Sequence, residues 1–235
     1  MLGWDGELPP PLVRTIEEMR PVLWDPACDC TGALYYMYRD LAKSDTDWRW
    51  LHAHHLRYDL TVIPPRDLCG ERVKTKGHYH PPDPAGVGYP EIYEVLEGEA
   101  HYLLQSRNLT DIIMISAAAG DIVIIPPGYG HISINPSPDT TLAMANIVST
   151  AFESEYGEYE SHRGAAYYEL TAGELRKNPH YPEVPPVRSV RPRSGNGDHR
   201  VPKGPLYSLI GNAEALAFLN APEESAAILS ILLKE

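Results

Sequence analysis

The stretch 75–135 carries two polar motifs that restrict the fold and the chemistry of this chain more than any other feature. The first motif ends in His78-Tyr-His80. Residues two apart in a strand point to the same face, so these two imidazoles can converge on one cation. The second motif, 120–135, places His131 after an apolar strand and a Pro-Pro-Gly-Tyr-Gly turn. We therefore expect His131 to meet the other two histidines where their strands lie side by side.

A strand expected over 91–96 supplies a carboxylate to the same place. Regular alternation puts Glu91 and Tyr93 on the inward face of this strand and Glu94 on the opposite face. Neutral imidazoles together with one carboxylate form a donor set that suits divalent transition metals. The sequence thus predicts a metal site made by His78, His80, Glu91 and His131.

The same spacing of two histidines also occurs at His52 and His54. These residues lie in a tryptophan-rich stretch, expected to be helical or irregular, that has no neighbouring strand to complete a site. We interpret this pair as structural, and it serves as an internal comparison for the metal-site prediction.

The two polar motifs resemble the paired motifs of the cupin superfamily. In that superfamily a glycine follows the ligating glutamate after six residues, as Gly98 follows Glu91 here. Two departures stand out: Arg72 replaces the glycine expected six residues before His78, and the loop 81–90 is longer than usual. The resemblance implies an all-β jelly-roll barrel, also called a double-stranded β-helix, but such a fold hosts many reactions. The second motif matches at every spacing through Gly120, Pro126, Gly128, His131 and Asn135.

A narrower resemblance is to the cupin-type phosphoglucose isomerases of archaea and some bacteria, and it extends over about residues 15–160. It implies an aldose-ketose isomerase of glycolysis and gluconeogenesis that interconverts glucose 6-phosphate and fructose 6-phosphate. The segments that carry it are LYYMYR at 34–39, LRYDLTVIPP at 56–65, TKGHYH at 75–80, YPEIYEVLEGEAHYLLQ at 89–105 and IPPGYGHISIN at 125–135.

This resemblance also implies roles for individual residues. The four predicted ligands would hold one divalent ion per subunit, Fe(II) or Mn(II), although Ni(II) and Zn(II) suit the same donors. Glu91 and His131 would be catalytic, with Glu91 moving a proton between C1 and C2. A direct hydride shift between these carbons is the competing mechanism. The implied substrate contacts are Tyr38, Thr61, Thr75, Gly77, Tyr93 and Tyr156.

Two other functions are compatible with the same ligands: a mononuclear iron dioxygenase and a non-catalytic sugar-binding cupin. A dioxygenase needs an apolar pocket that oxygen can reach. The hydroxyl groups of Tyr38, Thr61 and Thr75 suit a sugar phosphate better. Formation of glucose 6-phosphate from fructose 6-phosphate would exclude both alternatives.

Composition limits the partners and the location of the protein. The chain has 32 acidic and 20 basic side chains, a formal net charge of −12, which disfavours nucleic acids and anionic membranes as partners. It lacks a long apolar run, and its first six residues are unlike a signal peptide, so we expect a cytoplasmic protein. Cys28 and Cys30 are not spaced as C-x-x-C, and Cys69 has no evident partner. We expect all three cysteines to be reduced.

The 235 residues are enough for one all-β domain with extensions. We expect an N-terminal arm over 1–33, the barrel over 34–160, and a C-terminal helix, strap and tail over 161–235. Gly, Pro and Asn/Asp turns separate about nine short strands, which is typical of a closed barrel or sandwich. These are expected at 34–38, 56–63, 73–79, 91–96, 100–105, 112–115, 121–125, 132–134 and 141–149.

The extensions carry their own signals. Capping boxes at 15–18 and 171–174 predict helix starts, the first helix running to about Met19. The segment 179–205 holds seven prolines and should form an extended strap that docks the tail, which has helical character at 213–219. Because the resembling isomerases are homodimers, and sheet edges need covering, we expect a homodimer in which N-terminal strands add to the partner's sheet.

Overall fold

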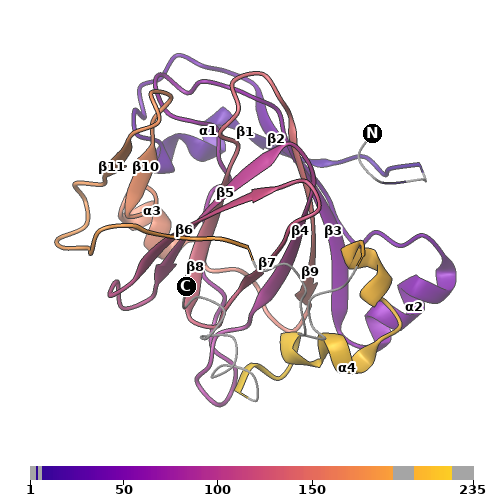
Figure 1. Ribbon diagram of the computed structural model, residues 1–235. Helices are drawn as coiled ribbons and strands as arrows, with labels where there is room; N and C mark the ends of the chain where they lie inside the picture. Colours follow the sequence, from indigo (N-terminus) through magenta and orange to yellow (C-terminus); the bar gives the residue numbers. More distant parts are fainter. Residues whose placement is uncertain (1–3, 5–6, 193–203, 224–235) are drawn as a thin grey trace.

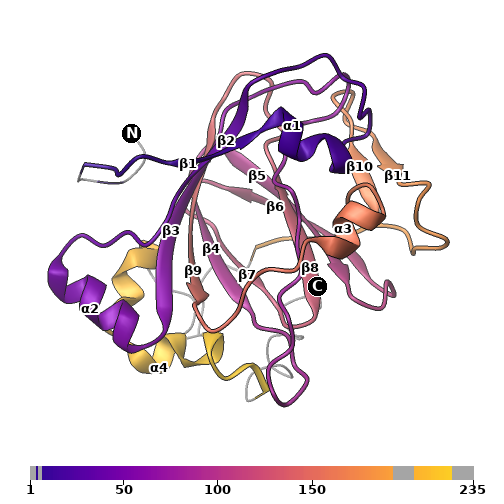
Figure 2. The same cartoon turned by 180° about the vertical axis from the view of Figure 1, so that it is seen from behind.

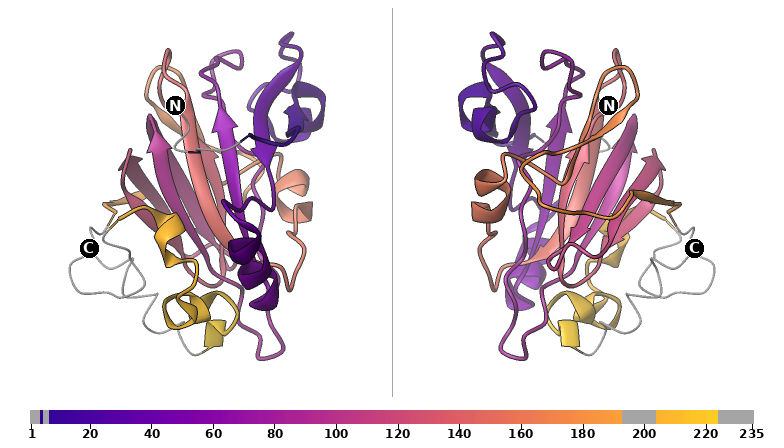
Figure 3. Two further views of the ribbon diagram at one scale, coloured as in Figure 1. Left: turned by 90° about the vertical axis from the view of Figure 1, so that its right-hand side faces the viewer. Right: turned by 90° about the vertical axis from the view of Figure 1, so that its left-hand side faces the viewer.

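The computed structural model describes residues 4, 7–192 and 204–223, and these form two β-sheets packed face to face. Figure 3 views the two layers from the side, and Figure 1 shows the smaller sheet together with the edge of the larger one. This arrangement confirms the predicted all-β jelly-roll fold with short helical extensions.

The larger sheet has six strands, all of them antiparallel to their neighbours. Strands that are distant in sequence lie side by side in it, so the predicted ligand strand is held between two neighbouring strands. In spatial order the strands are β1 (Leu12–Thr15), β2 (Ala33–Tyr38), β3 (Leu56–Ile63), β9 (Leu142–Ser149), β4 (Glu91–Glu97) and β7 (Ile122–Ile125).

The smaller sheet has four strands, and a separate two-stranded hairpin stands beside it. Its order is β12 (Arg188–Val190), β6 (Ile112–Ala118), β5 (Glu99–Ser106) and β8 (Tyr129–Ile134), and β12 joins β6 in parallel. The strap that was predicted after residue 179 thus covers an edge of its own chain's sheet. The remaining part of the strap, 193–203, lies outside the described residues.

Apolar side chains fill the space between the sheets and also cover both outer faces. Between the sheets, Val95 and Met144 of the larger sheet belong to one cluster with Tyr102 and Ile113 of the smaller sheet. This two-sided burial explains why β9 is buried along its whole length. Outside the larger sheet lie α2 (Asp45–Ala53), η2 (Leu206–Leu209), α4 (Ala213–Leu216) and η3 (Ala217–Leu219), and α3 (Gly157–Ser161) packs outside the smaller one.

The described part of the tail docks on the outer face of the larger sheet. The carboxylate of Glu94 accepts a hydrogen bond of 2.8 Å from the Leu206 backbone N–H. Glu94 therefore points away from the space between the sheets, on the face opposite to Glu91. The residues after 223 lie outside the described part of the chain. No helix in the described residues is both long and apolar enough to cross a membrane.

The two capping boxes have different outcomes. The first starts α1 (Ile16–Met19), with the Glu18 carboxylate accepting from the Thr15 backbone and hydroxyl, and a 3-10 turn, η1 (Arg20–Val22), follows. The second does not start a helix. It lies in the turn between β10 (Tyr167–Glu169) and β11 (Leu175–Lys177), where Gly173 adopts a φ of 83° that ends helical geometry. The helix predicted there is a hairpin.

Two further predictions are wrong. The segment 73–79 is no continuous strand, because it makes single bridges such as Lys74 to Ile134 and His78 to His131. Cys28 and Cys69 form a disulfide across a sequence separation of 41 residues, whereas Cys30 is free. The spacing of the cysteines along the chain could not reveal this pair, because Cys28 and Cys69 meet only in the folded structure.

His101 of β5 ties the hairpin to the smaller sheet, and this contact predicts a pH dependence of stability. His101 Nδ1 lies 2.8 Å from a carboxylate oxygen of Glu169, and both side chains are largely buried. Burial lowers the pKa of His101, but the hydrogen bond and charge of Glu169, together with Glu99, outweigh it, so the pKa is raised. A raised folded-state pKa adds stability below the unfolded value, about 6.5, and this gain disappears as the pH rises through the raised pKa.

We therefore expect Glu169→Gln to lower the free energy of unfolding by about 1 kcal/mol at about pH 6 and by much less at about pH 9. Urea unfolding at both values measures the difference. Glu99→Gln is the matched comparison and should show a smaller loss in the same direction, because Glu99 is 55% exposed and lies 3.6 Å from the ring. Equal losses at both pH values for Glu169→Gln would contradict the assignment.

Candidate metal centre

His78 and His80 reach the site from a segment that is anchored to β8. The backbone of His78 exchanges hydrogen bonds of 3.3 and 3.1 Å with His131, which sets the three imidazoles against one another. Gly77 permits this close approach with a φ of 82°, since a Cβ there would lie 2.5 Å from a side-chain carbon of Ile132. The Nε2 atoms of His78 and His80 are 3.1 Å apart.

Glu91, the first residue of β4, completes the cluster from the facing sheet. One carboxylate oxygen, Oε2, lies 3.4 Å from Nε2 of His80 and 3.4 Å from Nε2 of His131. The ligand atoms of all four residues lie within 4.8 Å of one another. The structure thus brings together His78, His80, Glu91 and His131, the set that the sequence singled out.

Neighbouring groups orient these ligands. Nδ1 of His80 donates to the Tyr89 carbonyl at 2.8 Å, because a carbonyl can only accept, and this leaves Nε2 of His80 with a free lone pair. Oε1 of Glu91 accepts from the Asn146 amide at 2.7 Å. Oε2 of Glu91 is buried and has no hydrogen-bond partner among the described residues. A cation among the Nε2 atoms would satisfy this oxygen, so the residues fit a bound metal ion.

The protonation states agree with this fit. Burial lowers the pKa of His80 to about 4. Burial, with the neighbouring His131 and His80, also holds the pKa of His78 well below its usual value. Both imidazoles are therefore neutral at physiological pH, as metal ligation requires. Burial raises the pKa of Glu91 to about 8, against a hydrogen bond with Tyr93 and the charge of Arg39, so the charge of a bound cation would be needed to keep this carboxylate ionised at neutral pH.

A cavity opens beside the cluster, and most of the predicted substrate contacts line it. Each of these residues belongs to the inner face of β3 or β4, to the segment 75–80 that is anchored to β8, or to the chain just before α3. The predicted contacts that line the cavity are Thr61, Thr75, Gly77, Tyr93 and Tyr156.

Tyr38 is the exception. Its side chain packs against the cluster on the outer face of the larger sheet, with residues such as Tyr58 and Leu60. Tyr35 and Met37 line the cavity instead. Because alternate residues of β2 face opposite sides, Tyr35 and Met37 face the cavity and Tyr38 faces away from it, so the placement expected for Tyr38 is corrected.

The cavity also holds positive charges that the sequence analysis missed. Arg39 and Arg57 line it and share one buried carboxylate, Asp59, at 2.6 and 2.9 Å. Since one carboxylate neutralises one of two guanidinium groups, a positive charge remains. Arg14 and Lys76 line the cavity as well. The position of Lys76, two residues before a ligand, was the one signal of this charge in the sequence.

The comparison pair of histidines lies elsewhere. His52, in α2, contacts the Asp40 carboxylate at 2.9 Å, and Nδ1 of His54 lies 2.8 Å from the Trp50 carbonyl. Neither residue belongs to a cluster of potential ligands in the described part of the chain. Their side chains are therefore engaged structurally, as expected.

The family model and the curated relatives that match this chain carry the same family name. The sequence model of the family Glucose-6-phosphate isomerase (GPI) matches residues 13–185. The glucose-6-phosphate isomerases of Thermococcus litoralis and Pyrococcus furiosus are 34% and 31% identical to this chain over 90 residues. Each match covers 38% of this chain and 45% of the relative, so it spans less than half of their length.

Solved structures resemble the chain more distantly. An oxalate oxidase aligns with a TM-score of 0.39 and 14% identity, over 52% of this chain and 54% of the other. A cupin-like protein from Thermotoga maritima aligns with a TM-score of 0.34 and 18% identity, over 57% and 86% of the two chains. The fold is accordingly argued from the strand pairing described above.

Proposed function

Because the chain belongs to the glucose-6-phosphate isomerase family, we propose that it interconverts glucose 6-phosphate and fructose 6-phosphate in its cavity. One observation carries the proposal: a cluster of four potential metal ligands and several positively charged side chains line the same cavity. A substrate that bears vicinal oxygens at one end and a phosphate at the other matches both features. The segment 75–80 supplies groups to both ends.

The cofactor would be one divalent ion held by His78, His80, Glu91 and His131. Fe(II) or Mn(II) is our first choice, with Ni(II) and Zn(II) as alternatives. When bound, the ion supplies Lewis-acid polarisation of the substrate carbonyl. The Asn146 amide fixes one oxygen of Glu91, so the other oxygen stays directed at the Nε2 atoms of His80 and His131. We assign to Glu91 the transfer of the proton between C1 and C2.

Arg14 is the strongest candidate for recognition of the phosphate. Arg14 lines the cavity, and its Nε atom is buried and has no hydrogen-bond partner among the described residues. Its NH1 group donates to Glu18 at 3.0 Å, and Glu18 also closes the capping box of α1. The pairing of β1 with β2 shifts register next to Arg14, a kind of irregularity that re-aims side chains at functional sites. Thr75 and Lys76 would contact the same phosphate.

We expect Arg14→Met to raise KM for fructose 6-phosphate by about 10- to 100-fold with a smaller change in kcat, because a charged hydrogen bond contributes about 1.5–3 kcal/mol. Steady-state kinetics measure the split. Arg72→Met is the matched control, since Arg72 donates to the Thr171 carbonyl and does not line the cavity. An unchanged KM in Arg14→Met would remove this residue from the phosphate site.

The proposed activity is tested by supplying fructose 6-phosphate to metal-loaded protein and following glucose 6-phosphate in a coupled assay. Mannose 6-phosphate is measured alongside, because an enediolate can be reprotonated on either face. Turnover that disappears on chelation and returns with Fe(II) or Mn(II) supports the proposal. Binding of the sugar phosphate without turnover would instead identify a non-catalytic sugar-binding protein.

We further propose a homodimer that forms through the edge strand β1. The side chains of Leu12 and Val13 are 61% and 41% exposed, and β1 pairs only with β2 among the described residues. Figure 2 shows β1 beside β2, where it forms an edge of the larger sheet. An exposed apolar edge of this kind favours addition of a partner strand.

Sedimentation equilibrium at micromolar concentration should give twice the chain mass of 26.2 kDa. The double substitution Leu12→Lys with Val13→Lys should shift the equilibrium towards monomer, because the added charges would be buried in the interface. A mass of one chain that does not change with concentration would refute the dimer.

A further inference from the structure

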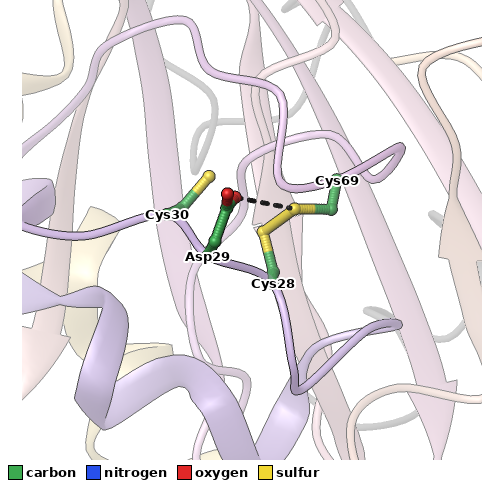
Figure 4. Close-up of side chains that lie close together, drawn as sticks. All are labelled: Cys28, Asp29, Cys30 and Cys69. Atoms are coloured by element: carbon green, nitrogen blue, oxygen red, sulfur yellow. Dashed lines mark hydrogen bonds between the residues drawn. A yellow bond between two sulfur atoms is a disulfide. The ribbon is translucent and has the colours of Figure 1, made fainter.

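The three cysteines of the chain all lie at one place on the N-terminal side of the barrel. Figure 4 shows Cys28 and Cys30 on one loop and Cys69 on a facing turn, with Asp29 between them. Cys28 and Cys69 are joined, and the Cys30 thiol donates to the Asp67 carbonyl at 3.6 Å. Oδ1 of Asp29 lies 3.9 Å from the Cys69 sulfur.

A disulfide accounts for only two of these four groups. The ligand atoms of all four residues lie within 4.8 Å of one another. In a tetrahedral zinc site with bonds of about 2.3 Å, neighbouring sulfurs are about 3.8 Å apart, so the sulfurs of Cys28 and Cys69, which are bonded to each other, would have to separate on reduction to take up this spacing. We propose that the reduced protein binds a structural divalent ion of the zinc class through Cys28, Cys30, Cys69 and Asp29.

The backbone around the cluster is held in place by hydrogen bonds. Arg20 donates to the carbonyls of Cys28 and Cys30 at 2.5 and 3.2 Å, and Arg66 donates to the Thr31 carbonyl at 2.7 Å. Arg66 also brings positive charge next to a site whose four ligands carry more negative charge than one divalent ion balances, whereas Arg20 is paired with Glu17. These hydrogen bonds hold the loop in addition to the disulfide between Cys28 and Cys69.

The turn that carries Cys69 is also held in an unusual backbone conformation. Cys69 has a φ of 57°, a left-handed conformation that costs a residue with a side chain about 1–2 kcal/mol. The carboxylate of Asp67 accepts from the Gly70 backbone N–H and holds this turn. Strain that the surroundings maintain in this way is typical of functional positions.

The two states are connected by a balanced reaction. A dithiol reductant gives two electrons and two protons to the bond between Cys28 and Cys69, and the dithiol becomes a disulfide. The ion then displaces one proton from each of the three thiols and binds the ionised carboxylate of Asp29. Either state links the N-terminal arm to the turn that precedes Thr75 and the ligand histidines.

Cobalt(II) tests the proposal independently of the isomerase activity, because thiolate ligands give it an intense charge-transfer absorption and tetrahedral geometry gives it strong visible bands. The full chain is reduced with a dithiol, freed of metal with a chelator and titrated with cobalt(II) under anaerobic conditions. We expect a thiolate-bound tetrahedral ion in addition to any ion at the histidine cluster. His131→Ala should keep the thiolate bands.

Cys30→Ser is the decisive variant, because it leaves the two residues of the disulfide intact. We expect it to weaken cobalt binding at the cysteine cluster by at least about 10-fold relative to the wild type. Added zinc should displace the cobalt from the wild-type cluster until the thiolate bands are lost. Unchanged affinity in Cys30→Ser, or a wild type without thiolate bands after complete reduction, would overturn the proposal. Wild-type protein that shows the thiolate bands but has no isomerase activity would refute the proposed function and would still support the cysteine site.

Discussion

Alanine at His78, His80 or His131 is expected to remove the bound ion and to lower kcat/KM by about 10³-fold or more. The reason is that the bound ion would stabilise the transition state by several kcal/mol. All three imidazoles belong to the ligand cluster, and no other histidine among the described residues lies near enough to replace one of them. Metal content per chain and coupled-assay kinetics on each variant measure the two effects.

The comparison histidines give this prediction its control. His52→Ala and His54→Ala should retain the ion and most of the activity, because these rings contact Asp40 and the Trp50 carbonyl in and around α2. Equal metal loss in these two variants would mean that the site is elsewhere.

The ion should also contribute to stability. It would link the anchored segment before residue 80 to β4 and β8, and a ligand that binds only the folded state stabilises it by mass action. Chelation should therefore lower the melting temperature of the wild type and should not lower that of His131→Ala further.

The ligand set could be predicted from the sequence because each part of it depends on a local rule. Two-residue periodicity directs His78 and His80 to one side, and the same periodicity separates Glu91 from Glu94. The alternation held for the histidines even though their segment makes only single bridges and no continuous strand. A turn of fixed spacing then delivers His131 to the same place.

What the sequence could not reveal depends on tertiary structure. Periodicity in β2 predicts that alternate residues share a face, but it does not say which face is inward, and so Tyr38 was chosen where Tyr35 lines the cavity. Arg14 enters the cavity through the pairing of an N-terminal edge strand, a contact without any local signal. The meeting of Cys28 with Cys69 has the same origin.

The two capping boxes show how context decides a local motif. At Thr15 the box is followed by residues that can continue a turn of helix, and Ile16 and Met19 are buried against the core. At Thr171 the same pattern contains Gly173, which takes a left-handed conformation and allows the chain to reverse. Packing on the smaller sheet then selects the hairpin, because local helix propensity is weak beside tertiary contacts.

The clearest separation of catalytic from structural carboxylates should come from the pair Glu91→Gln and Glu94→Gln. These residues lie three apart on β4 but on opposite faces, one at the ligand cluster and the other against the tail. We expect Glu91→Gln to lower kcat by about 10²- to 10⁴-fold, the range of general acid–base catalysis. Glu94→Gln should leave kcat nearly unchanged, since a glutamine oxygen can still accept from the Leu206 backbone N–H.

Isotope transfer distinguishes the proton-transfer role of Glu91 from a purely structural one. If Glu91 carries the proton between C1 and C2, turnover in deuterium oxide should place deuterium on carbon in the product, because a carboxylic acid exchanges its proton with solvent. A direct hydride shift would leave the product without deuterium, and the loss in Glu91→Gln should then parallel its loss of metal. Comparable losses of kcat in both variants would contradict the placement of the two carboxylates on opposite faces of β4. Glu91→Gln protein that keeps its ion, turns over with this lowered kcat and still binds fructose 6-phosphate is the result that the proposed mechanism requires.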